Sequence, residues 1–416
     1  MKKIFIVLFL ACLISNAGFA QKDLNPGTYA YITIENPDNF ARKNSPVVIP
    51  VTDITAKFKK YNKQRIGIFD GSKEIESQFD DLNNDGIADE VAFLVDLAPK
   101  AKVKLMVRML PPNFEIPNFK KEVFAELMKK DKVDGADHFT MVTEASSDKD
   151  DMYNKMQHHG VAFESAEIAY RLYFDKKQTV DVYGKITPKL EIAETQWYPK
   201  DEQLAKGYGD DVLKVNESVG VGTVKGWDGS KATHVEVMSK RTQRIVATGN
   251  LRNVVEIEVQ GWQYAGKTFN VKMRYIQYAR HRDVEAQVLF DKDFKDSITL
   301  CTGVQRMPEE KFHTDKTNLV GIWGKDFPVN DSIKFGKQTI GLGVVIPTQY
   351  AKQQVDDKLN HLVLLQNNGQ PFIRFYLTAA AMKEKKGYKN ADVFFQYLED
   401  WKKEMLSPVV VTITEK

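Results

Sequence analysis

The sequence predicts an all-β fold made of a small N-terminal β-sandwich and a large antiparallel two-sheet sandwich, with one C-terminal amphipathic helix. Three observations support this prediction. Short runs rich in β-branched and aromatic residues recur along the chain, and turn residues separate them. Many of these runs alternate apolar and polar side chains, whereas a single long segment has a helical period. The sequence has no repeat of solenoid or propeller length, which favours sandwiches over those architectures.

The first 20 residues have the pattern of a secretory signal peptide. Lys2 and Lys3 precede an apolar run from Ile4 to Ile14, and small residues stand shortly before Gln21. This run is shorter than the roughly 20 apolar residues of a membrane span. We therefore expect a secreted protein with no membrane span, in the periplasm or outside the cell. A lipoprotein modified at Cys12 is the minor alternative.

Composition limits the classes of partner. The chain has 416 residues and two cysteines, and cleavage of the signal would leave Cys301 with no partner for an intrachain disulfide. The formal net charge is +3, or +1 without Lys2 and Lys3, so neither nucleic acid nor an anionic membrane is a predicted partner. Aromatic residues make up 11% of the chain, which favours β-structure and contact with an oligosaccharide or polysaccharide. No organic cofactor is expected.

Residues 21–135 are predicted to form the small sandwich and a connector that leads out of it. Its predicted strands are Tyr29–Ile34, Val47–Val51, Arg65–Asp70, Ile75–Phe79, Val91–Asp96 and Lys102–Arg108. Three prolines then interrupt regular structure, and Glu122–Lys130 is expected to form a short helical turn.

The turn between two of these strands resembles the opening of a calcium-binding loop. Asp81, Asn83, Asp85 and Asp89 offer hard oxygen ligands, and a glycine follows Asp85 where such loops turn sharply. The position of the bidentate glutamate of an EF-hand is Ala92, so the loop is no EF-hand. Two interpretations stay open: a structural calcium that braces the hairpin, or a plain hairpin turn.

Residues 136–416 are predicted to form the large sandwich domain. Beyond residue 230 the expected strands are His234–Met238, Arg244–Thr248, Val254–Gln260, Phe269–Ala279, Val284–Phe290, Thr299–Val304, Val320–Trp323, Gln338–Ile346, Leu362–Leu365, Phe372–Ala381 and Val409–Ile413. One amphipathic helix is expected over Asn390–Glu404, because Phe394, Leu398 and Trp401 fall on one face.

The densest group of ionisable side chains falls on two predicted strands within residues 157–185. Alternation gives one face to the apolar residues Ile168, Tyr170, Leu172, Phe174, Val180 and Val182. The other face collects Arg171, Tyr173, Asp181, Tyr183 and Lys185, with His158, His159 and Glu164 near one edge. Acid, base, phenol and guanidinium groups together suit a site that holds an anionic ligand and moves a proton. The alternative is an ordinary solvated face, since Tyr and Arg are common on sheet surfaces.

Loops that follow this segment carry aromatic candidates for substrate binding. Trp197 and Trp227 stand among glycines and acids, where their rings could stack on sugars. The alternative for each is an anchor that pins the loop to the core. His234 is a second candidate for substrate binding, although a lone strand histidine is more often a surface or satisfied interior residue.

Several runs resemble a known family. HHGVAFESAEIAYRLYFDKKQTVDVYGK is the most specific of them, and IFDGSKEIESQFDDLNNDGIADEVAFLVDLAP and FFQYLEDWKKEMLSPVVVTI add to it. They look like a secreted bacterial family of unknown function, of about this length, encoded among genes for glycan breakdown. The resemblance implies a galactose-mutarotase-like supersandwich and a carbohydrate ligand, and it implies no catalytic residues.

The leading hypothesis is a secreted enzyme that acts on uronate-containing oligosaccharides, as a lyase or a hydrolase. For a lyase, Arg171 would hold the carboxylate, His158 or His159 would be the base and Tyr173 the acid. Lys185 would add a second cationic contact, and Glu164 would fix a histidine tautomer. For a hydrolase, the paired carboxylates would be Glu164 and Asp181. A non-catalytic glycan-binding or accessory protein and an aldose epimerase are the alternatives.

Overall fold

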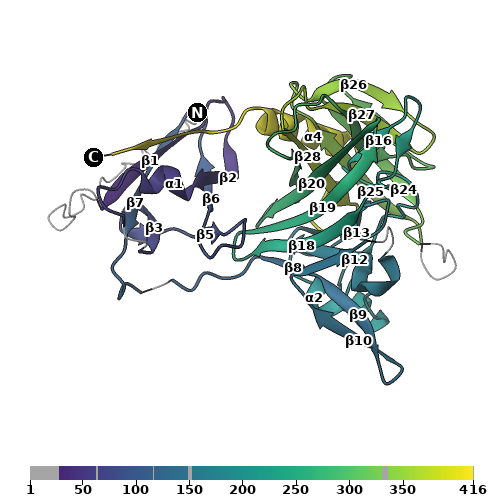
Figure 1. Ribbon diagram of the computed structural model, residues 1–416, viewed down its shortest axis with the longest axis horizontal. Coiled ribbons are helices and arrows are strands. Elements are labelled where there is room, and N and C mark those ends of the chain that lie inside the picture. The colour runs from purple at the N-terminus through teal and green to yellow at the C-terminus, as the bar shows by residue number, and fades with distance from the viewer. Residues whose placement is uncertain (1–27, 62–63, 116, 149–151, 330–335, 416) are drawn as a thin grey trace, which may run out of the picture.

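The computed structural model describes residues 28–61, 64–115, 117–148, 152–329 and 336–415. The predicted signal peptide and Cys12 lie outside the described residues. The predicted all-β fold, with a small sandwich, a large antiparallel sandwich and a C-terminal amphipathic helix, is confirmed (Figure 1).

The small domain consists of two antiparallel sheets around one apolar core. The first sheet has the order β29 (Val410–Thr414), β1 (Tyr29–Glu35), β7 (Lys102–Met109), β3 (Ile66–Asp70) and β4 (Lys73–Glu74). The second has the order β2 (Arg42–Pro50), β6 (Glu90–Leu97) and β5 (Ser77–Asp80), and α1 (Val51–Thr55) follows β2. Ile32, Val47, Ile68, Phe93 and Val107 are buried between the two sheets.

The large domain is built on a nine-stranded antiparallel sheet. Its order is β11 (Glu144–Ser147), β18 (Lys240–Thr248), β19 (Arg252–Tyr264), β20 (Lys267–Tyr278), β21 (Val284–Phe290), β28 (Phe372–Ala381), β25 (Gln338–Val345), β24 (Leu319–Asp326) and β23 (Lys311–Thr314). Period-two alternation sends Val255, Ile257 and Val259 of β19 into the main core, as predicted.

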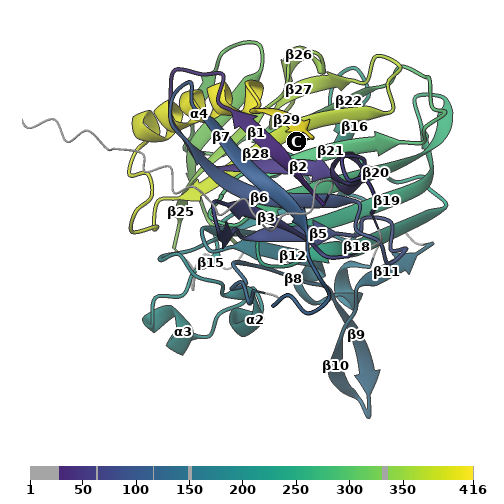
Figure 2. The ribbon, with the colours of Figure 1, turned by 90° about the vertical axis from the view of Figure 1, so that its left-hand side faces the viewer.

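Two five-stranded sheets cover the inner face of the nine-stranded sheet. One has the order β15 (Asp210–Asp211), β14 (Val180–Gly184), β13 (Ile168–Tyr173), β12 (Gly160–Ser165) and β8 (Val123–Glu126). The other has the order β17 (Ala232–Thr233), β16 (Lys225–Trp227), β22 (Thr299–Gln305), β27 (Asn360–Gln366) and β26 (Ala351–Asp356). A separate hairpin, β9 (Met128–Val133) and β10 (Ala136–Met141), projects from this side of the domain (Figure 2).

Helix α4 (Ala391–Leu406) packs on the outer face of the nine-stranded sheet. Asn390 caps its first turn by accepting a hydrogen bond from the Val393 amide at 3.0 Å. The buried side chains Phe394, Leu398 and Trp401 form one face, as predicted. A β-carbon at Gly341 would lie 2.6 Å from the Phe394 ring, so this glycine provides the space that the helix occupies.

Three local predictions are wrong. Residues 122–130 form parts of β8 and β9 rather than a helical turn, because pairing of β8 with β12 and β9 with β10 overrides a weak local preference. No strand forms over 234–238, and β17 ends at Thr233. The last strand, β29, belongs to the small domain rather than the large one: it pairs with β1 and so covers an otherwise open sheet edge (Figure 1).

The two domains share a packed and charged interface. Ala92 of β6 packs against Val254, Ile276 and Tyr278 of the large sheet. Arg252 of the large domain pairs with Asp80 at 2.6 Å and with Glu90 at 2.9 Å. Both kinds of contact hold the small domain over the end of β18–β20. Within the described ranges, no helix is long and apolar enough to cross a membrane.

Candidate functional site

Arg171 on β13 is the centre of a buried polar network. The register of β13 with β14 places Arg171 directly opposite Asp181, and both side chains leave the face opposite to the apolar core. The Arg171 Nε donates to Asp181 Oδ2 at 2.9 Å and Nη2 donates to the same oxygen at 2.6 Å. Nη2 also donates to Asp211 Oδ2 at 3.0 Å. One guanidinium therefore serves two carboxylates.

The polar face is not the solvent-facing surface that alternation alone predicts. Arg171 is 3% exposed, and Asp181 and Trp197 are fully buried. The segment between β14 and β15, which includes α2 (Ile192–Thr195) and α3 (Asp201–Ala205), brings Trp197 over this face. The Arg171 guanidinium lies 4.4 Å from the Trp197 ring centre. The outcome for Trp197 is a buried anchor whose indole Nε1 donates to Asp211 at 3.2 Å.

Tyr198, next to Trp197, connects Arg171 to His159. The Tyr198 residue is 48% exposed, while its hydroxyl lies 2.8 Å from Arg171 Nη1 and 3.0 Å from His159 Nε2. His159 Nδ1 lies 3.1 Å from the carbonyl oxygen of Tyr153, which can only accept. We therefore assign the ring proton to Nδ1, so that Nε2 accepts the Tyr198 hydroxyl proton.

Two pairs of adjacent residues near this hydrogen bond have a strained, left-handed backbone. His158 and His159 have φ values of 56° and 62°, and Gln196 and Trp197 have φ values of 52° and 67°. Within the described part of the chain, these are the only adjacent non-glycine residues that share the left-handed region. Such conformations cost about 1–3 kcal/mol each and cluster at functional sites. The first pair contains His159, and the second pair directly precedes Tyr198. The two pairs therefore position the two residues of the His159–Tyr198 hydrogen bond.

Electrostatics separates the titratable groups of this network into an acid and a base. Burial lowers the pKa of His159 to about 4, so the ring is neutral near pH 7. Burial raises the pKa of Asp211 to about 8, helped by Asp181 and opposed by Arg171. Burial of its hydroxyl also raises the pKa of Tyr198. A neutral imidazole thus accepts a hydrogen bond from a protonated phenol. The two shifts keep the proton on the phenol, where it can be donated to a substrate.

A cavity of about 450 Å³ reaches this network from outside. Trp197, Tyr198 and Asp211 form part of its wall, and the exposed residues Lys200 and Asp201 also line it. His159 meets the cavity only through Tyr198. We name the group of His159, Tyr198, Arg171 and Asp211, together with this cavity, the tyrosine–histidine site.

The two predicted histidines point in different directions. His158 is 1% exposed and bonds through Nε2 to the carboxylate of Glu126 on β8. His159 stacks on Tyr153, with ring centres 3.6 Å apart, and reaches Tyr198. Only His159 therefore joins the network of Arg171. Tyr173 also joins it, because its hydroxyl donates to Asp181 Oδ2 at 2.9 Å.

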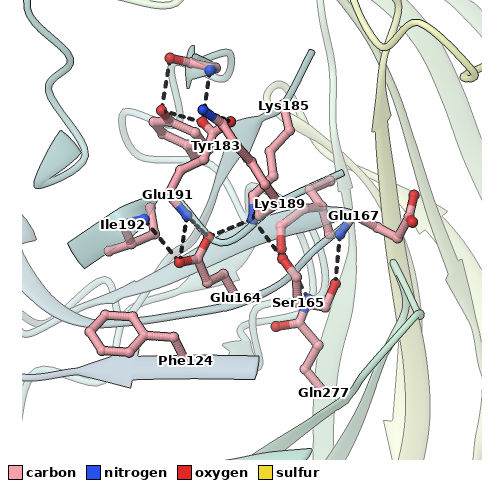
Figure 3. A network of polar contacts seen from close by, with 12 residues as sticks. Phe124, Glu164, Ser165, Glu167, Tyr183, Lys185, Lys189, Glu191, Ile192 and Gln277 are labelled. Carbon is pink, nitrogen blue, oxygen red and sulfur yellow. Dashed lines mark hydrogen bonds and ion pairs between the residues drawn. The ribbon is translucent and has the colours of Figure 1, made fainter. Parts of the chain in front are cut away.

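Glu164 and Lys185 form a second buried network, separate from the cavity (Figure 3). Lys185 Nζ donates to Glu164 Oε2 at 2.5 Å and to the carbonyl oxygens of Ser165 and Lys189, both at 2.6 Å. These three acceptors use all three ammonium protons. Glu164 accepts the backbone amides of Glu191 and Ile192 at 2.9 Å. These bonds fix the segment between β14 and β15 onto β12. Both side chains are buried.

The remaining predicted substrate residues lie on the other five-stranded sheet or beside it. Trp227 is half-buried on β16, and its backbone is held by the Tyr264 hydroxyl. His234 binds Lys225 at 2.9 Å and Glu217 at 2.8 Å. Glu217 also lies 3.8 Å from Lys177, whose ammonium faces the Tyr173 ring. His234 is thus linked through Glu217 and Lys177 to Tyr173, a neighbour of Arg171, and neither His234 nor Trp227 lines the cavity of the tyrosine–histidine site.

The loop predicted to hold calcium is organised by its own carboxylates. Asp81 accepts the amides of Asn83, Asp85 and Gly86, and Asp89 accepts the amide of Leu82 at 2.7 Å. These oxygens suit calcium chemically. In the described residues, however, no three His, Cys, Asp or Glu side chains gather closely enough to hold a metal ion. Calcium binding at this loop stays a prediction.

Sequence reasoning missed Tyr198, Asp211 and Glu126. Tyr198 lies in a loop and Asp211 in a two-residue strand, β15, too short to show periodicity, and their partners are 27 and 40 residues away along the chain. The only signal was the position of Tyr198 beside a tryptophan already chosen as a candidate. Glu126 lies in a segment predicted to be helical, which concealed its pairing with His158.

Comparison with known proteins gives a family and no activity. A family model described as "Domain of unknown function (DUF4861)" matches residues 34–411. The chain belongs to the DUF4861 family. No curated protein matches this DUF4861 chain.

Two solved structures resemble the DUF4861 chain weakly. One is a protein in the glycosyl hydrolase family 38 from Enterococcus faecalis, with 8% identity and a TM-score of 0.47 over 94% of this chain and 48% of that chain. The other is an alpha-mannosidase from Enterococcus faecalis V583, with 9% identity and a TM-score of 0.43 over 94% of this chain and 46% of that chain. The chain thus spans about half the length of each. Similarity at this level does not extend to activity.

Proposed function

We propose that this protein is a secreted carbohydrate-active enzyme that acts on uronate-containing oligosaccharides by proton transfer at the tyrosine–histidine site. The observation that carries the proposal is the bonded chain from the Tyr153 carbonyl through His159 and Tyr198 to Arg171 at the wall of a cavity. A half-exposed tyrosine hydroxyl held between a neutral imidazole and a guanidinium can act as a general acid–base group.

The substrate class follows from what such a group can remove. A proton-transfer group beside a guanidinium can act on a carbon acid, and a uronate supplies one because its C5 proton lies beside a carboxyl group. In the elimination, the C5 proton leaves to the base and the C4–O bond breaks. The electron pair forms the C4–C5 double bond, and the leaving oxygen takes a proton. Tyr198 would exchange protons with substrate, His159 would orient the Tyr198 hydroxyl by accepting its hydrogen bond, and Arg171 would stabilise the phenolate through Nη1.

The geometry supports elimination better than hydrolysis by Glu164 and Asp181. Both side chains are fully buried, and each is committed to its own network with Lys185 or Arg171. A hydrolase needs space for water between its carboxyl groups. Arg171 is a positioning residue in this proposal rather than a direct clamp on the substrate, because two carboxylates already take up its charge.

The test is product analysis on a panel of defined oligosaccharides, half with uronate units and half neutral, read by mass spectrometry. Elimination predicts fragments whose masses sum to that of the substrate and that absorb as unsaturated sugars. Fragments that gain the mass of one water would show a hydrolase instead. Binding of a panel member without cleavage would show a glycan-binding protein, and anomeric exchange seen by NMR without cleavage would show an epimerase. No reaction and no binding across the panel would overturn the proposal.

A further inference from the structure

A second hollow lies between the two domains, away from the tyrosine–histidine site. It consists of cavities of about 620 Å³ and 290 Å³ that share Asp283, Glu404 and Met405 in their walls. We name the two together the interdomain groove. One wall comes from residues 40–48 of the small domain, and another from the C-terminal half of α4. The floor is the outer face of β20, β21 and β28, the face that the core does not use.

Every cationic side chain that lines the interdomain groove has a carboxylate partner. The pairs are Arg280 with Glu76 at 2.9 Å, Arg282 with Glu384 at 3.0 Å, Arg374 with Glu285 at 2.9 Å, Arg252 with Asp80 at 2.6 Å, Arg42 with Asp38 at 2.5 Å, Lys403 with Asp400 at 2.8 Å and His281 with Asp283 at 3.1 Å. Such pairs present donors and acceptors side by side with little net charge. They suit a ligand that is polar and neutral rather than an anion.

Aromatic side chains interrupt this polar lining. Phe40 and Trp401 line the larger cavity, and Tyr278 and Tyr376 line the smaller one. A groove lined by both rings and paired charges matches the two surfaces of a sugar, whose ring face is apolar and whose edge carries hydroxyl groups. Grooves between domains are also common places for ligand sites.

Two carboxyls whose pKa values are shifted in opposite directions, those of Glu404 and Asp283, lie at the junction of the two cavities. Burial raises the pKa of Glu404, so this carboxyl holds its proton more tightly than an exposed one. Burial acts in the same sense on Asp283, but the neighbouring His281 outweighs it and lowers the pKa of Asp283. Each carboxyl also has a cationic neighbour, Arg42 at 3.7 Å from Glu404 and His281 at 3.1 Å from Asp283, and each offers oxygens to which a sugar hydroxyl can donate.

From this geometry we propose that the interdomain groove is a binding site for a neutral oligosaccharide that extends from Trp401 to Tyr376. This site is independent of the proposed reaction, since it shares no lining residue with the tyrosine–histidine site. It would hold a glycan whether or not the other site cleaves one.

The experiment is calorimetric titration of the full chain with neutral hexasaccharides built from glucose, mannose, galactose or xylose. We expect at least one to bind, and Tyr376→Ala to weaken that binding about tenfold, as loss of a stacking ring costs roughly 1.4 kcal/mol or more. Gln287→Ala, on the floor beside it, is the second variant if Tyr376→Ala does not fold. Tyr198→Phe should leave the affinity unchanged, and so should a change from low to high salt.

Three results would overturn the inference. The first is the absence of binding by all four neutral hexasaccharides. The second is binding that both groove variants leave intact, because the ligand would then occupy another site, which is the tyrosine–histidine site if Tyr198→Phe abolishes the binding. The third is an affinity that falls steeply with salt, which would assign the groove to a charged ligand.

Discussion

Replacing Lys185 by methionine distinguishes a structural lysine from a substrate-binding one. Lys185 is 1% exposed, and its three ammonium protons are donated to Glu164 and to two backbone carbonyls. Lys185→Met removes all three bonds and leaves the buried Glu164 carboxylate with the amides of Glu191 and Ile192 alone. Removal of one partner of a buried ion pair typically costs about 3–5 kcal/mol. We expect a loss of this size in the free energy of unfolding.

The assay is urea unfolding followed by tryptophan fluorescence, which reports on the large domain because all five tryptophans lie there. A second substitution, Glu164→Gln in the Lys185→Met background, removes the stranded charge and keeps an acceptor for the two amides. It should recover part of the loss. Lys206→Met, on an exposed turn, is the matched control and should change stability by less than about 0.5 kcal/mol. A loss below about 1 kcal/mol for Lys185→Met, together with weaker oligosaccharide binding, would refute the structural reading.

Three further predictions concern pH and metal. The pKa of His159 is about 4, so the rate on an oligosaccharide should stay level through neutral pH and fall only near pH 4. A fall centred near the ordinary histidine pKa of about 6.5 would contradict this expectation. Burial opposes the charge of His281, but Asp283 and the Asn44 carbonyl outweigh it and raise the pKa of His281 to about 8. Its contribution to stability is therefore complete below about pH 6.5 and is lost as pH rises through 8, so the urea midpoint should drop between these values in the native protein and not in His281→Leu. If the loop containing Asp85 binds calcium, the melting temperature should rise with calcium, fall with a chelator and stop responding in Asp85→Ala; an unresponsive native protein would leave only a hairpin turn.

Local periodicity predicted most of the fold because each strand has one face toward a core. The alternation of Ile168, Tyr170 and Leu172 with Arg171 and Tyr173 was read correctly, and the first three are fully buried in the main cluster. The same pattern could not show what covers the opposite face. That depends on the segment between β14 and β15, whose tryptophan and carboxylates meet Arg171 only in the folded chain.

The candidate site was predictable in part for the same reason. Arg171, Tyr173 and Asp181 share one face of adjacent strands, so strand pairing alone brings them together. The direction of each histidine depends on a left-handed backbone at two successive residues, which is uncommon even though histidine adopts this conformation more often than most residues. Tyr198 meets His159 only because a second left-handed pair turns its loop inward. Contacts between distant segments and left-handed backbone conformations could not be predicted, because neither produces a periodic pattern in the sequence.

The proposed reaction depends on proton exchange between Tyr198 and the substrate, and the turnover of Tyr198→Phe measures that dependence. This change removes one hydroxyl and keeps the ring, so the cavity wall persists. Tyr208→Phe is the matched control, since its hydroxyl bonds to Glu194 and does not line the cavity. On a uronate-containing oligosaccharide, kcat should fall by about 10²–10⁴-fold in Tyr198→Phe and by less than about twofold in Tyr208→Phe. Equal turnover by Tyr198→Phe and the native protein would contradict the account.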